Sequence, residues 1–192
     1  ADALGGYLPL VCTLNASRVL DAMGAVLGVD YAEFDALALS VPDAGGLVFL
    51  PYLEGERTPN LPDATASLHG VTRANSTPAR FARAAVEGMI CGLAAGLTAL
   101  QDAGVACRRV LLVGGGAQST AVAQIAAEVF GLPVVVPEPG EYVAAGAARQ
   151  AAWTLTGELP QWDSGRSRTV EAGAKPSILQ RFTDVRRAVH PL

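Results

Sequence analysis

The chain has 192 residues and a mass of 19.7 kDa, with 51% hydrophobic and 17% charged residues. This composition excludes an intrinsically disordered protein and suffices for one globular domain with a buried core. The net charge of −4 and the isoelectric point of about 5.1 exclude a typical nucleic-acid-binding surface, which needs clustered Lys and Arg side chains.

The cysteines and the most apolar segment narrow the class of protein further. Cys12, Cys91 and Cys107 are widely spaced and form no C-x-x-C pair, so we expect neither a disulfide framework nor a metal site, and a reducing compartment. The apolar stretch 84–100 contains Glu87 and three glycines, which is typical of a core helix and not of a membrane span. We therefore expect a soluble cytoplasmic protein. Because no initiator Met is present, we interpret the chain as starting inside a larger protein or a processed product.

Alternating strand and helix patterns run along the chain. In chain order we expect a strand at 7–13, helices at 15–27 and 31–40, a strand at 47–50, a long helix from Pro78 ended by Gly104, a strand at 110–113, a helix at 119–130, a strand at 133–136 and a helix reaching about Leu155. Thr77 before Pro78 is a good amino-terminal cap, and Gly28 and Gly131 are good helix ends. The order predicts an α/β domain in which some strands are parallel.

The composition changes after Gly157. Residues 158–192 are more polar and include a short basic helix at 177–189. We therefore divide the chain into a domain of residues 1–157 and a polar tail of residues 158–192, and we expect that tail to be a surface appendage.

A run of three glycines follows the strand at 110–113. At Gly114, Gly115 and Gly116 no β-carbon keeps a ligand away from the backbone, and the next helix starts at Ser119. The free N–H groups and positive dipole end of such a helix favour an anion or a nucleotide. The run matches neither a Walker A loop nor G-x-G-x-x-G, so a purely structural turn explains it equally well.

Longer segments around this run resemble a known family. The residues 112–119, 124–128, 131–134 and 137–148 are similar to the adenosine-binding region of the FGGY carbohydrate kinases. The segment 66–87 resembles the second signature of that family and departs from it at Arg80. The loop 49–60 resembles the loop typical of its xylulokinase branch. The resemblance implies an actin-like, ribonuclease H-like ATPase fold with a mixed sheet that is incomplete at its amino terminus.

The resemblance also implies a set of nucleotide-binding positions. They are Gly114, Gly115, Gly116, Ala117, Thr120, Asn15 and Val19. The cofactors it implies are ATP and, bound with the nucleotide, Mg²⁺. Gly146 and Ala147 match small residues of the family's closing helix, where tight helix packing explains them as well. Glu56 and Arg57 either face an interdomain cleft or form a local ion pair.

The family's catalytic aspartate lies in an amino-terminal domain, ahead of any segment of this chain. We therefore expect no catalytic residue and no metal ligand here, and a chain that is inactive alone. The implied function is the ATP-binding lobe of a kinase that converts D-xylulose to xylulose 5-phosphate, with a homodimer left open. The alternatives are a kinase of ribulose, gluconate, glycerol or another polyol, and a non-catalytic nucleotide-binding module.

Overall fold

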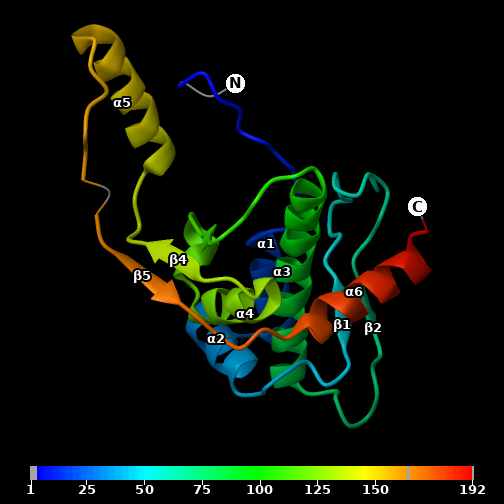
Figure 1. Cartoon of the computed structure of the whole chain (residues 1–192). Helices are drawn as coiled ribbons and strands as arrows, with labels where there is room; N and C mark the ends of the chain where they lie inside the picture. Colours follow the sequence, from blue (N-terminus) through cyan, green and yellow to red (C-terminus); the bar gives the residue numbers. More distant parts are fainter. Residues whose placement is uncertain (1–3, 164, 192) are drawn as a thin grey trace.

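A computed structural model describes residues 4–163 and 165–191 of the chain (Figure 1). In chain order its elements are α1 (Arg18–Leu27), α2 (Tyr31–Leu39), β1 (Val48–Leu50), β2 (Ser67–His69), α3 (Pro78–Asp102), β3 (Val110–Leu111), the 3₁₀ helix η1 (Gly115–Gln118), α4 (Thr120–Phe130), β4 (Val134–Pro137), α5 (Tyr142–Thr156), β5 (Ser167–Val170) and α6 (Pro176–Val189). The predicted long helix and the α/β class are confirmed.

The strands form two small sheets. The strands β1 and β2 pair antiparallel, whereas the second sheet has the order β3-β4-β5. In that sheet β3 and β4 are parallel and β5 is antiparallel to β4. The expected mixed sheet is therefore present, and the parallel pair brings the carboxyl ends of β3 and β4 to one edge.

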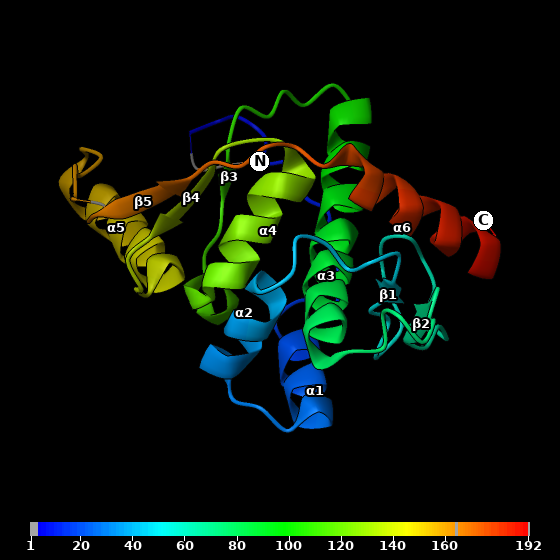
Figure 2. The same cartoon turned by 90° about the horizontal axis from the view of Figure 1, so that it is seen from below.

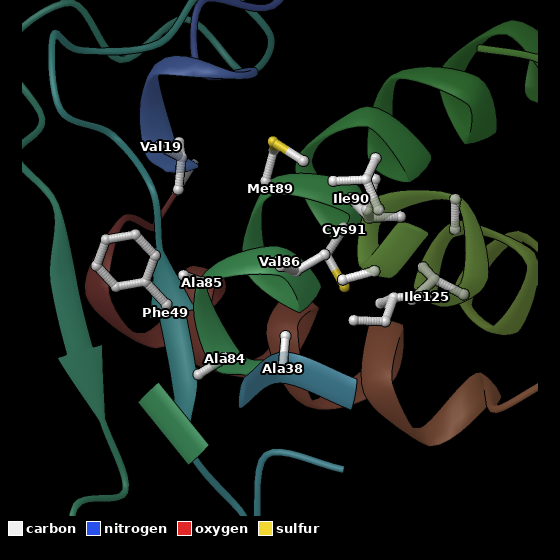
Figure 3. Close-up of a cluster of buried hydrophobic side chains, with 14 of the residues drawn as sticks. Val19, Ala38, Phe49, Ala84, Ala85, Val86, Met89, Ile90, Cys91 and Ile125 are labelled. Atoms are coloured by element: carbon white, nitrogen blue, oxygen red, sulfur yellow. The ribbon is translucent and has the colours of Figure 1, made fainter. Parts of the chain in front are cut away.

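The helix α3 forms the centre of the core. Thr77 caps it by accepting the backbone N–H of Arg80, and Pro78 takes its first position. The elements α1, α2, β1 and α4 surround it (Figure 2). Their side chains, including Val19, Phe49 and Ile125, pack on its buried face (Figure 3). By length and hydropathy α3 passes as a membrane span, but 56% of its apolar window is buried inside the domain, as in a core helix.

A buried charge network joins α3 to two other segments. Arg83 is only 2% exposed, and its Nε donates to Oε1 of Glu87 at 2.7 Å. Its Nη2 pairs with Glu128 on α4, and Nζ of Lys175, just before α6, lies 3.0 Å from Oε1 of Glu128. Because the Arg83 guanidinium lies out of water, these carboxylates replace the hydration it would otherwise have.

The segment expected as a first strand is not a strand. The side chains of Tyr7 and Leu10 are each 86% exposed, and among the described residues no strand pairs with 7–13. The pattern was correct for an apolar extended segment, but a β-strand exists only where a neighbouring strand accepts its hydrogen bonds.

The residues after Gly157 are packed on the domain, which corrects the expectation of a surface appendage. The strand β5 pairs with β4, and α6 buries Ile178 and Phe182 against the core. These two side chains are four residues apart, so they share one face of α6. The residues around Ile178 and Phe182 are mostly polar, so the sequence did not indicate this short apolar face. The division of the chain at Gly157 remains a proposal.

The helix α5 stands away from the rest of the domain (Figure 1). None of its residues is buried, and Val143 and Leu155 are almost fully exposed. A β-carbon added at Gly146 would meet no atom within 4 Å. The interpretation of Gly146 and Ala147 as residues of a tight helix contact is therefore wrong within the part of the chain that the structure describes.

Candidate nucleotide-binding site

The glycine run lies between β3 and α4. Gly114 has φ of +97°, a conformation that other residues rarely adopt, and it turns the chain out of the strand. The run is not fully open, because Gly115 and Gly116 belong to the 3₁₀ turn η1, in which the Ala117 N–H donates to the Gly114 carbonyl at 3.2 Å. A β-carbon at Gly114 or Gly115 would nevertheless meet no atom within 4 Å. The backbone there faces open space.

That space is a cleft of about 700 Å³. Three segments line it, and their residues are Leu112, Val113, Gly114, Gly115, Ala117 and Gln118, then Val136, Pro137, Glu138, Pro139, Gly140, Glu141 and Tyr142, then Arg166, Ser167 and Arg168. The cleft therefore lies at the carboxyl ends of the parallel strands β3 and β4, where ligands of open α/β sheets bind. Its volume lies within the range of about 300 to 1,000 Å³ typical of small-molecule sites.

The start of α4 is already occupied by a carboxylate. Asp35 Oδ1 accepts the Ser119 hydroxyl at 2.6 Å, and its Oδ2 accepts the backbone N–H of Thr120 at 2.6 Å. The expectation that this helix end is open to an anion is therefore wrong, because the Asp35 side chain of α2 takes that position. Thr120 lies against Asp35 and not in the lining of the cleft. No local signal pointed to Asp35, which is 85 residues away in sequence.

Asn15 and Val19 also lie outside the lining of the cleft. The Asn15 amide donates to the Gly55 carbonyl at 2.7 Å and accepts the N–H of Leu53 at 3.0 Å, so it fixes a loop. Val19 is fully buried in the core. The residue of this segment that meets the glycine run is Ser17, whose Cβ would lie 3.2 Å from a β-carbon added at Gly116. The role of Asn15 and Val19 as nucleotide-binding residues stays a prediction, while Ser17 is the side chain that lies against Gly116.

Glu56 and Arg57 form no ion pair with each other among the described residues. Glu56 is 3% exposed, and its Oε1 accepts the backbone N–H groups of Leu14 and Arg57, each at 2.8 Å. The Arg57 guanidinium donates to Cys12 Sγ at 3.5 Å. Glu56 therefore acts as a buried acceptor that fixes the loop. Its contact with Arg57 is a hydrogen bond from the Arg57 backbone, and not the ion pair that was one of the two expectations.

Comparison with known proteins identifies a family for the chain. Residues 10–155 match the family described as "FGGY family of carbohydrate kinases, C-terminal domain". The chain belongs to this family. As an FGGY kinase domain it has the α/β, actin-like fold predicted from the resemblance, and it is part of a phosphotransferase family whose members use ATP. The family match ends before β5 and α6.

The relatives include kinases of more than one sugar. The chain is 40% identical, over its whole length, to a xylulose kinase of Streptomyces rubiginosus, but it spans only 40% of that relative's length. The crystal structure of a xylulose kinase from Bifidobacterium adolescentis superposes with a TM-score of 0.87 at 44% identity, covering 97% of this chain and 37% of that one. A gluconate kinase from Lactobacillus acidophilus superposes with a TM-score of 0.76 at 25% identity. The match covers 92% of this chain and 39% of the gluconate kinase chain.

Proposed function

We propose that this chain is the nucleotide-binding lobe of a kinase that transfers the γ-phosphate of ATP to D-xylulose and forms xylulose 5-phosphate. The observation that carries the proposal is the glycine turn, whose backbone at Gly114 and Gly115 faces a cleft of about 700 Å³. The similarity to xylulose kinases, which extends over nearly all of this chain, supports the choice of sugar. Mg²⁺ bound with the nucleotide and a cytoplasmic location belong to the same proposal.

In this proposal the residues of the glycine run have two different roles. Gly114, Gly115 and Ala117 line the cleft and lie against the nucleotide. Gly116 and Thr120 position the run, because Gly116 fits closely against Ser17 and the Thr120 N–H is held by Asp35. ATP supplies the phosphoryl group, and the turn holds the nucleotide in one orientation, which contributes to the rate through proximity.

Transfer to a sugar hydroxyl also needs a base on that hydroxyl. The resemblance assigns this base to an aspartate of the amino-terminal lobe, so we propose that the chain alone does not phosphorylate sugars. Loss of a general base costs on the order of a hundred- to ten-thousand-fold in rate, and loss of the sugar pocket costs more.

The sugar is tested by coupled ADP release with D-xylulose, D-ribulose, glycerol and gluconate. The assay compares this chain with a longer protein that contains both this chain and the amino-terminal lobe of an FGGY kinase. We expect turnover with D-xylulose from the longer protein only. Sugar-dependent turnover by the chain alone would contradict the assignment of the base. Preference for gluconate or glycerol would favour the second candidate function, which the similarity to a gluconate kinase and to glycerol kinases supports.

We expect Gly115→Val to weaken ADP and ATP binding at least tenfold without lowering the thermal midpoint of the chain. The new side chain meets no protein atom within 4 Å at its Cβ, so it extends into the space proposed for the nucleotide. Titration calorimetry on the chain measures the effect, with Gly173→Val as the control because its Cβ also meets nothing and it lies outside the cleft lining. Unchanged affinity in Gly115→Val would show that the turn is only structural.

A further inference from the structure

Two arginines, Arg168 of β5 and Arg166 just before it, line the same cleft as the glycine turn. Arg166 and Arg168 are among its lining residues, together with Ser167 between them. All three lie beyond residue 155, where the match to the FGGY carboxy-terminal domain ends. The segment that follows the matched region therefore contributes one wall of the candidate site.

The pairing of β4 with β5 determines where these side chains lie. Arg168 is directly opposite Val136, and directly opposed residues of an antiparallel pair have their side chains on the same face. Val136 is 7% exposed and itself lines the cleft, and Arg168 lies on the same face of the sheet as Val136. Arg166 is two residues earlier and shares that face. Its carbonyl accepts the Glu138 N–H at 2.9 Å, which continues the pairing beyond the strand.

The charges in the cleft lining balance only because of these arginines. Glu138 and Glu141 contribute two carboxylates, and Arg166 and Arg168 contribute two guanidinium groups. Within the described residues no N–O distance of 4 Å or less joins either arginine to an acidic side chain. The guanidinium groups are therefore not engaged in structural ion pairs and are available to an anion in the cleft.

We propose that Arg166 and Arg168 bind the phosphates of the nucleotide, an inference that rests on the proposed nucleotide-binding function. A guanidinium group presents a planar fork of N–H donors that matches two phosphate oxygens at once. Without the two arginines, the only charged side chains of the lining would be the carboxylates of Glu138 and Glu141, and their repulsion would oppose binding of a polyanion. The tail thus makes the cleft suitable for a di- or triphosphate.

The test compares ligands that differ only in their phosphates. Adenosine, AMP, ADP and ATP are titrated into the wild-type chain, Arg166→Ala, Arg168→Ala, the double variant and Arg168→Lys. We expect about a tenfold or larger loss of ADP and ATP affinity in the double variant, because hydrogen bonds between charged groups have that effect. Adenosine affinity should change less than twofold. Arg168→Lys should recover part of the loss, since it keeps the charge but not the fork.

Arg73→Ala is the matched control, because Arg73 is exposed and lies outside the cleft lining. Equal ADP affinity in the wild type and the double variant would overturn the inference and leave nucleotide binding intact. An equal loss for adenosine and ADP at an unchanged thermal midpoint would overturn it too, because the arginines would then act on the nucleoside. A wild-type chain that binds none of the four ligands would instead refute the proposed function itself.

Discussion

Replacing Gly88 by alanine is expected to destabilise the domain by about 3 kcal/mol, a large effect for one added methyl group. Gly88 is the point at which α3 crosses β1, and a β-carbon there would lie 2.2 Å from the backbone carbonyl oxygen of Phe49. That oxygen cannot move alone, because Phe49 is registered opposite Leu68 in the β1–β2 pair. The helix and the hairpin must therefore separate. Urea unfolding of the wild type and the variant measures the difference.

Gly92→Ala is the control on the same helix. It lies one turn further along α3, and its added β-carbon would meet no atom within 4 Å. Since alanine favours the helix over glycine by about 0.8 to 1 kcal/mol, we expect this variant to be as stable as the wild type or more stable. Equal stability of both variants would contradict the close packing of α3 on β1.

Removing the guanidinium of Arg83 is expected to cost about 3 to 5 kcal/mol, because Arg83→Ala leaves Glu87 and Glu128 buried without their main counter-charge. Arg80→Ala is the comparison, since the Arg80–Asp43 pair is partly exposed to solvent. Such exposed pairs contribute about 0 to 1 kcal/mol. Free energies of unfolding at pH 7 measure both. A loss of similar size in the two variants would show that burial of the Arg83 network has no special effect.

The pH dependence of Arg83→Ala provides a second readout. Burial raises the pKa of Glu87 above its ordinary value of 4.5, although the hydrogen bond from Arg83 opposes this shift. Because the pKa of Glu87 is higher in the folded state than in the unfolded state, the contribution of Glu87 to stability is fully present below pH 4.5. That contribution is lost as pH rises through the pKa of the folded state. In Arg83→Ala the hydrogen bond that lowers the pKa of Glu87 is absent, so the variant loses more stability than the wild type as pH rises. We therefore expect the stability gap between wild type and variant to narrow as pH falls from 7 towards 4, and a constant gap would contradict this origin.

Local patterns were sufficient for most of the helices. Thr77 and Pro78 predicted the start of α3, and Gly28 and Gly131 predicted the ends of α1 and α4, because caps depend on a few neighbouring residues. The segment at 7–13 failed for the opposite reason. Its apolar pattern is local, but the partner that would make it a strand is not.

The candidate site shows the same division. The glycine run at Gly114–Gly116 was visible in the sequence, since only glycine suits the backbone at Gly114 and leaves the adjacent space open. Asp35, Ser17 and Arg168 were not, because each reaches the run or its cleft from a distant part of the chain. Nothing in their own neighbourhoods distinguishes them from other polar residues.

The sequence by itself determined the family, the order of the helices and the turn at which the cleft forms. These depend on residue types at short spacings, which a single chain displays directly. Only the tertiary structure decided that the carboxylate of Asp35 caps α4, that Ser17 lies against Gly116, and that β5 completes the wall of the cleft. Each of these depends on packing between segments far apart in the chain, and long-range contacts leave no periodic signal in the residues that make them.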